Sequence, residues 1–472
     1  MPTPTPVQAS IDLNDTLQPP QDAALLDALG VPAALRYFEP TYASAHARAA
    51  HIAPSAYART RNALDGGVTG LSPYLTHGII SLPEVARTVA AKHRLGYDDK
   101  LVFELGWREF FHHVWAAVPR SDAILADMRP ANVWRGKYAS VLPEDIRQGR
   151  TGVKAIDAAV RQLYATGYLH NHARMWLASY CVHMRKVHWR AGADWLVAHL
   201  LDGDLPSNHL SWQWMAATFS SKPYLFNASN VAKFAPEAAW KAWASAKSAI
   251  DMSYEQLDAV ARMQADVGPE PGAHAAVQEP AVYTALELLN LDAFKPLGHI
   301  EPAQAAMQKI AGREHRNASD AVVELVHPWG LTERNAACVP LSGSDSNFLQ
   351  NPSQTPSQTP LRIGIVHIAA HTRWPRSLRR WQFVITRMQA VCDVVFIGDA
   401  AQLAQCAGWP GRQHVVAQST LFEGYRDVLP RIATVQPQPK LFAQPDKLCN
   451  SFSQFYERAQ RAQPDFAKLL MP

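Results

Sequence analysis

Two polar clusters inside strongly helical sequence are the part of this 472-residue chain best suited to chemistry. One reads HNHARM (170–175) and the other DGDLPSNHLSWQW (202–214). Buried carboxylates, amides and guanidinium groups are costly unless each has a partner. Arg174 has no carboxylate nearby in sequence, so either Asp202 is its long-range partner or it is a solvated arginine. A large, flat, polar cofactor between the two clusters would supply the remaining partners.

Two further motifs each have two interpretations. The turn GGVTGLSP (66–73) offers backbone amides and hydroxyls that suit phosphates, but it is equally typical of an ordinary helix entry. In ELGWREFF (104–111), Glu104 and Arg108 lie four residues apart on one helix face. They form either a simple helix salt bridge or a carboxylate and an indole, Trp107, that face a cavity.

Composition excludes several kinds of site. The five cysteines are scattered without a CxxC pair, which argues against zinc and iron–sulfur sites and favours a reduced, cytoplasmic protein. His170 and His172 would point apart on a helix, so we predict no metal site. The N-terminal residues MPTPTPVQAS do not resemble a signal peptide, and no apolar run is long enough for a membrane span.

The overall charge of +4 does not mark a globally basic protein, although Lys and Arg outnumber Asp and Glu over residues 101–200. That excess indicates either a phosphate-binding face or a solvated helix face.

Hydrophobic periodicity divides the chain into a helical and an α/β part. We expect an N-terminal extension over 1–40, a helical domain over 41–245 and a helix–loop connector over 246–320. Strand patterns at 362–368, 393–399 and 412–418 alternate with helical patterns, which predicts a small parallel α/β domain over 321–472. The segment 322–327 could join its sheet, with the Ser/Gln/Pro-rich stretch 342–360 as a flexible loop. The predicted fold class is mainly α, with a smaller C-terminal α/β domain.

Four motifs in the order GLSPYLTHG, ELGWREFF, TGYLHNHARM and DGDLPSNHLSWQW resemble the FAD-binding helical domain of the DNA photolyase and cryptochrome family. The resemblance covers about residues 40–245. It implies that FAD lies folded inside the helical bundle. The implied cofactor-binding residues are Tyr57, Thr69, Gly70, Leu71, Ser72, Arg108, Arg174, Asp202, Asp204 and Asn208, with Asn208 facing flavin N5.

The resemblance also implies a substrate, DNA containing pyrimidine dimers. The positions that would contact the lesion or the DNA are Arg61, Glu104, Trp107, Asn171, His172, Met175 and Trp214. Asn171 and Met175 match the cyclobutane-dimer branch, whereas the (6-4) photolyases carry His at both positions. This chain departs from the family at Gly70, usually Arg, at His172, in place of a DNA-facing Arg, and at Leu101, often Trp.

Glu104 and Asn208 are the implied catalytic residues, together with the electron-transfer relay Trp212, Trp189 and Trp134. Three packed core tryptophans are the alternative interpretation of that relay. The family's N-terminal antenna domain is absent from its usual place. Residues 320–472 are therefore either a relocated antenna-like domain or an unrelated appendage, and we expect no antenna chromophore.

The sequence thus predicts a light-driven, FAD-dependent lyase for cyclobutane pyrimidine dimers. The alternative is a cryptochrome-like photoreceptor without repair, and a third possibility is a DNA-binding flavoprotein without photochemistry.

Overall fold

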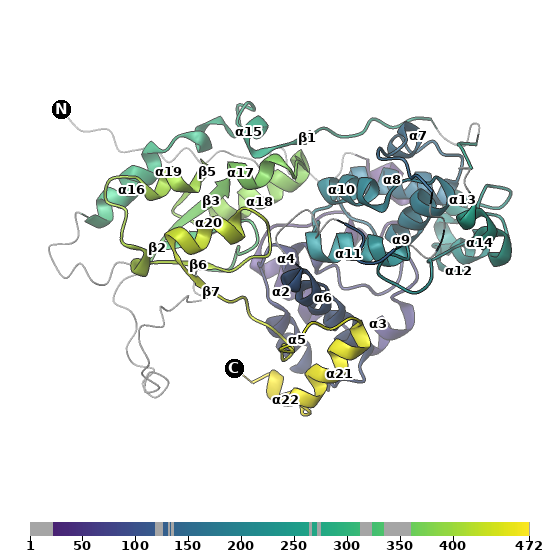
Figure 1. Cartoon of the computed structure of the whole chain (residues 1–472), viewed down its shortest axis with the longest axis horizontal. Helices are drawn as coiled ribbons and strands as arrows, with labels where there is room; N and C mark the ends of the chain where they lie inside the picture. The colour runs from purple at the N-terminus through teal and green to yellow at the C-terminus, as the bar shows by residue number, and fades with distance from the viewer. Residues whose placement is uncertain are drawn as a thin grey trace.

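The computed structural model describes residues 22–118, 126–130, 133, 136–263, 267–270, 275–311, 323–334 and 360–471. Figure 1 shows a helical body on the right and an α/β part, built on a parallel sheet, on the left. The predicted fold class, mainly helical with a smaller α/β part, is therefore confirmed. Within the ranges described, no helix is both long and apolar enough to cross a membrane.

The helical body consists of short helices whose ends follow local sequence signals. Ser81 and Glu84 form a capping box at the start of α5, and Gly167 ends α8 in the left-handed conformation, with φ 69°. The helices are α2 (Tyr42–Ala50), α3 (Pro54–Thr60), α4 (Ser72–Thr76), α5 (Leu82–Ala90), α6 (Lys100–Ala117), α7 (Glu144–Arg147), α8 (Lys154–Thr166), α9 (Asn171–Ser179), α10 (Trp189–His199), α11 (Leu205–Met215), α12 (Ala228–Phe234), α13 (Trp240–Trp243) and α14 (Tyr254–Arg262).

Residues 22–40, which we expected to be an extension, belong to the helical body. They form α1 (Ala23–Ala28) and a 3-10 turn, Ala33–Leu35, and bury Leu26 and Phe38. The indole of Trp243 donates a hydrogen bond of 3.0 Å to the Leu29 carbonyl. The sequence did not predict this packing, because the apolar run that follows the Pro- and Thr-rich start of the chain is only a few residues long.

The α/β part contains a five-stranded, wholly parallel sheet in the order β5-β3-β2-β6-β7. Strand β2 lies at its centre, so the predicted addition of segment 322–327 to the sheet is confirmed. From β2 the strands β3 and β5 are added toward one edge of the sheet, and β6 and β7 are then added toward the opposite edge. This reversal of strand order is typical of doubly wound folds. The strands are β2 (Val323–Val326), β3 (Leu361–His367), β5 (Val394–Gly398), β6 (Val415–Gln418) and β7 (Thr434–Gln436).

Four helices accompany these strands: α17 (Ile368–Thr372), α18 (Leu378–Val391), α19 (Ala400–Ala404) and α20 (Tyr425–Ile432). The connector forms α15 (Ala285–Leu288), α16 (Glu301–Ala311) and the short strand β1 (Val282–Tyr283), which pairs antiparallel with β4 (Arg376–Ser377). Of the predicted loop 342–360, residues 342–359 lie outside the described part of the chain.

Helix α18 connects the two parts through buried side chains. Arg380 donates hydrogen bonds of 2.9 Å to the Gly203 carbonyl and 3.2 Å to the Val197 carbonyl. Phe383 packs against Tyr74 and His77 of the helical body. The α/β part therefore reaches the backbone of the DGD motif and holds it in place.

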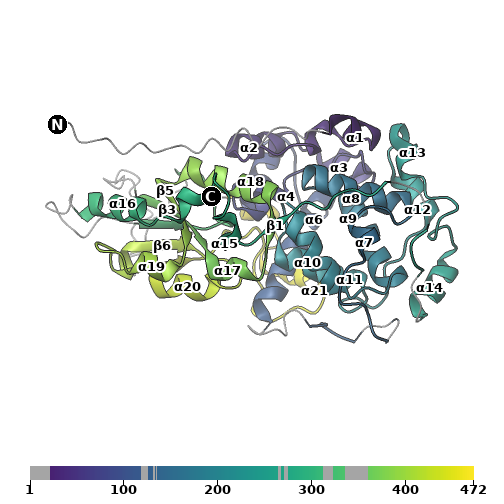
Figure 2. The ribbon, with the colours of Figure 1, turned by 90° about the horizontal axis from the view of Figure 1, so that it is seen from above.

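The last residues of the chain return to the helical body. Helix α21 (Phe452–Ala462) packs on α6, and α22 (Phe466–Leu469) lies near α5, at the yellow end of the ribbon in Figure 1. Figure 2 gives the same arrangement from above. The segment that we assigned to one α/β domain, 321–472, thus divides between both parts. Its apolar stripe, which includes Phe452, Phe455 and Tyr456, is buried on α6.

Candidate functional site

The two polar clusters meet in the structure. Arg174 of α9 and Asp202, which follows α10, form an ion pair of 2.8 Å between Nη2 and Oδ2. The second Asp202 oxygen, Oδ1, is buried and has no hydrogen-bond partner among the described residues. A buried acceptor without a donor is costly, so this atom fits a ligand N–H or hydroxyl, as a polar cofactor such as FAD would offer.

Asp204 differs from Asp202, because several protein groups already contact one of its oxygens, Oδ2. Oδ2 caps α11 by accepting a hydrogen bond of 3.1 Å from the Ser207 amide, and it lies 2.9 Å from His112 Nε2. The same oxygen lies 3.5 Å from Arg108 Nη1. Burial alone would raise the pKa of Asp204, but Arg108 and His112 lower it well below its usual range. Asp204 therefore stays ionised and positions the side chains around it.

Gly203, between the two aspartates, has no room for a side chain. A Cβ there would lie 2.3 Å from Arg380 Nη1 and 2.5 Å from the Val197 carbonyl oxygen. The glycine of the DGD motif is thus required chiefly by the close approach of the α10 backbone, against which Arg380 of α18 also packs. Sequence reasoning missed Arg380, since nothing in the motif indicates that a residue about 180 positions later reaches it.

The predicted phosphate turn lies next to an unexpected arginine. Gly70 has φ +60°, and a Cβ added there would lie 2.7 Å from Nη1 of Arg48 on α2. The family's usual arginine is missing at position 70, but a guanidinium from α2 lies against that position. Leu71 donates a 3.3 Å hydrogen bond to the Thr69 hydroxyl, and Ser72 begins α4.

Glu104 and Arg108 do not form the simple salt bridge that we weighed for them. Glu104 instead forms an ion pair with Lys100 Nζ at 2.8 Å and accepts a hydrogen bond from Arg61 Nε at 3.4 Å, whereas Arg108 faces Asp204. Burial, followed by the charge of Glu104, raises the pKa of Tyr57. Tyr57, Arg61 and Glu104 therefore form one partly buried group at the junction of α3 and α6.

The residues of the HNHARM cluster make two separate sets of contacts at the start of α9. Asn171 Nδ2 lies 3.4 Å from the Met175 sulfur, so these two predicted lesion residues share one face of α9. His170 caps that helix by accepting 3.1 Å from the His172 amide. Burial, with a smaller contribution from the charge of Arg61, lowers the pKa of His172 to about 4. His172 is therefore neutral near pH 7 and brings no positive charge to this surface.

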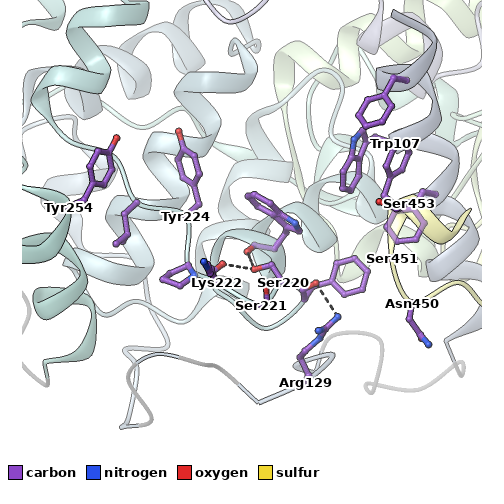
Figure 3. A pocket seen from close by; sticks show the side chains of 17 residues that line it. Trp107, Arg129, Ser220, Ser221, Lys222, Tyr224, Tyr254, Asn450, Ser451 and Ser453 are labelled. Atoms are coloured by element: carbon purple, nitrogen blue, oxygen red, sulfur yellow. Dashed lines mark hydrogen bonds between the residues drawn. The ribbon is translucent and has the colours of Figure 1, made fainter. Parts of the chain in front are cut away.

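Trp107 and Trp214 line one cavity of about 790 Å³ (Figure 3). Tyr224 and Tyr254 lie on the side opposite Trp107, with Lys222 and Arg129 between. Aromatic walls with a few cations and hydroxyls suit splayed bases and their phosphates. Arg129, Tyr254 and Phe452 are lining residues that sequence reasoning missed, because they come from three segments distant in sequence.

The structure describes two of the three tryptophans of the predicted relay, Trp212 and Trp189. Trp212 on α11 packs over Gly192 of α10, where a Cβ would lie 2.3 Å from its ring. Trp189 begins α10 and donates 2.6 Å to Asp127. Trp134 lies outside the described residues. Asn208 Nδ2 donates 2.9 Å to the Ala193 carbonyl, which fixes the orientation of its amide on α11.

Comparison with known proteins shows which family part of this chain resembles. Residues 101–244 match the family model described as the FAD binding domain of DNA photolyase. The deoxyribodipyrimidine photo-lyase of Streptomyces griseus is 40% identical over 149 residues, which cover 31% of this chain and 32% of that protein. The Synechococcus enzyme of the same name is 34% identical over 181 residues, covering 36% and 37% respectively. The chain thus spans about a third of the length of these curated relatives.

Among solved structures, a Synechocystis cryptochrome is 25% identical and aligns with a TM-score of 0.39, covering 45% of this chain and 46% of that chain. The match to the photolyase family model confirms both the predicted family resemblance and FAD as the cofactor.

Proposed function

We propose that this chain, whose residues 101–244 carry the FAD-binding domain of the DNA photolyase family, is a light-driven lyase that splits cyclobutane pyrimidine dimers in DNA. The observation that carries the proposal is the cavity that Trp107 and Trp214 share, with Lys222 and Arg129 beside it. It combines the two features that a flipped lesion needs, aromatic faces for the bases and cations for the phosphates.

The residues around Asp202 would hold the cofactor. Asp202 Oδ1 offers a buried acceptor, Arg174 a cation, and Tyr57 with the turn Thr69–Ser72 hydroxyls and amides for the phosphates. Asn208, whose amide is fixed by Ala193, would face flavin N5. When bound and reduced, FAD supplies an electron donor that light excites, and the two bonds between the bases break with no net electron consumed.

The protein itself would bind, orient and shield the lesion. Trp107 and Trp214 would cradle the extruded bases, because a stacked base inside the duplex is out of reach of the site. Asn171 and Met175, adjacent on α9, would contact the dimer from a second direction. Buried Asp204 keeps Arg108 and His112 in fixed positions, so charge in this region needs no rearrangement during the reaction.

Glu104 would hydrogen-bond the base, and a hydrogen bond that its carboxyl group donates would stabilise negative charge there. Both of its ion-pair partners, Lys100 and Arg61, contact Oε1. The other oxygen, Oε2, therefore remains for the base without loss of either pair.

The direct test uses the purified, flavin-reduced protein, an oligonucleotide that contains one thymine dimer, and blue light. Recovery of thymine absorbance near 260 nm, in light and not in darkness, supports repair. Photoreduction of the flavin without such recovery would instead support the alternative, a cryptochrome-like photoreceptor. One observation favours that alternative: His172, which is neutral near pH 7, stands in place of a DNA-facing arginine and brings no positive charge for a phosphate.

We also propose that the α/β part is a relocated antenna-like domain. The support is its doubly wound parallel sheet together with its position against the helical body. Superposition of this sheet on the antenna domain of a solved photolyase tests the idea, and a different strand order would refute it.

A further inference from the structure

The C-terminal helix lies directly on the helix that carries Glu104 and Trp107. Helices α21 and α6 pack closely because Gly106 has no side chain between them. A Cβ at Gly106 would lie 3.1 Å from the Tyr456 ring and 3.3 Å from Phe452. Residues more than 300 positions apart in sequence therefore share one surface beside the cavity.

Phe452 makes the closest aromatic contact of this surface. Its ring lies 4.2 Å from that of Trp107, centroid to centroid, at an interplanar angle of 9°. Phe103 meets the Phe452 ring edge-on at 4.7 Å. One face of the Trp107 indole is thus covered by a parallel ring from α21, which fixes the tilt of the indole.

The segment that carries Phe452 is anchored at several points. The buried carboxylate of Glu109 accepts from the Leu441 amide at 2.6 Å and from Gln444 Nε2 at 2.8 Å. The Tyr456 hydroxyl donates 2.7 Å to the Tyr97 carbonyl, and the Tyr97 hydroxyl donates 2.6 Å to the Gln463 carbonyl. Displacing α21 would expose its apolar stripe and leave a buried carboxylate without its donors, which is costly.

The cavity remains open with α21 in place. Phe452 and its neighbours Asn450, Ser451 and Ser453 line it together with Trp107 and Trp214. In Figure 3, Ser453 and Ser451 lie on the same side as Trp107. A volume of about 790 Å³ falls within the range of roughly 300–1,000 Å³ that is common for ligand pockets. A ligand can therefore enter without removal of the helix.

We propose that the C-terminal segment forms a fixed wall of the lesion pocket and that Phe452 is a specificity-determining residue for the dimer. This inference rests on the proposed function. The Phe452–Trp107 stack presents a rigid aromatic surface to the splayed bases, so Phe452 contributes to binding of damaged DNA and not to binding of undamaged DNA. Undamaged DNA keeps its bases stacked in the duplex and does not reach this wall.

The test compares Phe452→Leu with Phe455→Leu in the full-length, FAD-loaded protein. Phe455 lies on the same helix, is fully buried against Phe110 and His113, and does not line the cavity. The same substitution there perturbs α21 packing without changing the wall. Affinities are measured for one oligonucleotide duplex with and without a single thymine dimer, and the flavin spectrum reports the integrity of the cofactor site.

We expect Phe452→Leu to weaken binding of the dimer duplex about tenfold, as loss of base–aromatic stacking does, with undamaged binding and the flavin spectrum unchanged. Phe455→Leu should leave the damaged-to-undamaged ratio as in the wild type. Three results would each overturn the inference. They are an equal loss of affinity for the dimer duplex in both variants, no loss of affinity in Phe452→Leu, and tighter binding by Phe452→Leu, which would show that the ring blocks the cavity. If the wild type itself does not discriminate the dimer, the proposed function fails as well, and that outcome is distinct from the other three.

Discussion

Arg174 and Asp202 join the two polar clusters of the chain through an ion pair of 2.8 Å. The Asp202 side chain is 2% exposed and the Arg174 side chain 24%, so the carboxylate is buried while the guanidinium still reaches solvent. Oδ2 of Asp202 contacts Arg174, whereas the buried Oδ1 has no hydrogen-bond partner among the described residues. On the proposal above, Oδ1 would bind FAD, and the pair would connect the packing of the helical body to the cofactor.

Replacing Arg174 with Ala should both destabilise the protein and weaken flavin retention. A buried carboxylate loses its cation, which costs on the order of 2–3 kcal/mol when the partial exposure of Arg174 is allowed for. Urea denaturation and the ratio of flavin to protein absorbance measure the two effects. Arg461→Ala, which removes the exposed pair with Glu457, is the matched control and should change neither. Normal flavin content in Arg174→Ala would contradict the assigned role.

Stability should fall in mild acid because of buried, neutral histidines. Burial, followed by the charge of His172, lowers the pKa of His170 to about 3, whereas the unfolded chain titrates near 6.5. Below pH 6.5 the unfolded state binds a proton that the native state does not, so the free energy of unfolding decreases between pH 6.5 and 3. At pH 5 this single group accounts for about 2 kcal/mol.

His170→Asn tests this effect without removing the helix cap, because Asn also caps well. The variant should lose less stability than the wild type between pH 7 and pH 5, as followed by urea denaturation at both values. Replacement of the exposed His299 by Asn serves as the control and should leave the pH dependence unchanged. Identical pH dependence in all three proteins would refute the prediction.

Lys222 should contribute to DNA binding without regard to sequence or damage. It is exposed at the rim of the cavity beside Ser220 and Tyr224, where a phosphate can reach it. Lys222→Ala should weaken the binding of damaged and of undamaged DNA to a similar extent. It should also reduce the slope of log affinity against log salt concentration by about 1. Titrations at several salt concentrations measure the slope. Lys241→Ala, exposed on α13 and away from the cavity, should leave it unchanged.

Sequence motifs predicted the clusters but could not predict which atoms pair within them. The long-range pair of Arg174 with Asp202 was one of two interpretations, and the structure confirms it. The i, i+4 spacing of Glu104 and Arg108 suggested a pair that does not form, because Asp204 attracts Arg108 and two other cations occupy Glu104. Competition among charges from different helices is a property of the folded chain and cannot be predicted from spacing.

The strands of the sheet were predictable, whereas the course of the last residues was not. Continuous apolar runs such as 362–368 and 393–399 indicate buried parallel strands on their own. The apolar stripe of α21 indicates only an amphipathic helix and not the surface that covers it. The contact of Phe452 with Trp107 depends on how α21 packs on α6, so the sequence alone does not predict it.

Trp189→Phe tests the predicted electron relay. The variant keeps an aromatic ring but loses the oxidisable indole and its 2.6 Å hydrogen bond to Asp127. Photoreduction of the oxidised cofactor, followed by visible absorbance, should slow at least tenfold. Repair by chemically reduced protein should stay normal, since the relay is then not needed. Trp243→Phe, a buried tryptophan bonded to Leu29, is the control, and an equal slowing there would contradict the relay.

Glu104→Ala should lower the yield of repair per photon more than the affinity for the dimer. The Glu104 carboxyl group would donate to the base on which negative charge develops, and loss of one such hydrogen bond costs roughly tenfold or more in a catalytic step. Quantum yield and dissociation constant, measured on the same dimer oligonucleotide, separate the two effects. Equal losses in both quantities would show that Glu104 only binds the substrate.

The central claim is that light, acting on this protein, restores intact thymines. The most direct measurement is chromatographic separation of a dimer-containing oligonucleotide from its repaired form after incubation with the flavin-reduced protein. The account predicts conversion to the intact oligonucleotide under blue light, beyond one turnover per protein, and none in darkness. No conversion in light by a protein that holds reduced FAD and binds the dimer would contradict the account.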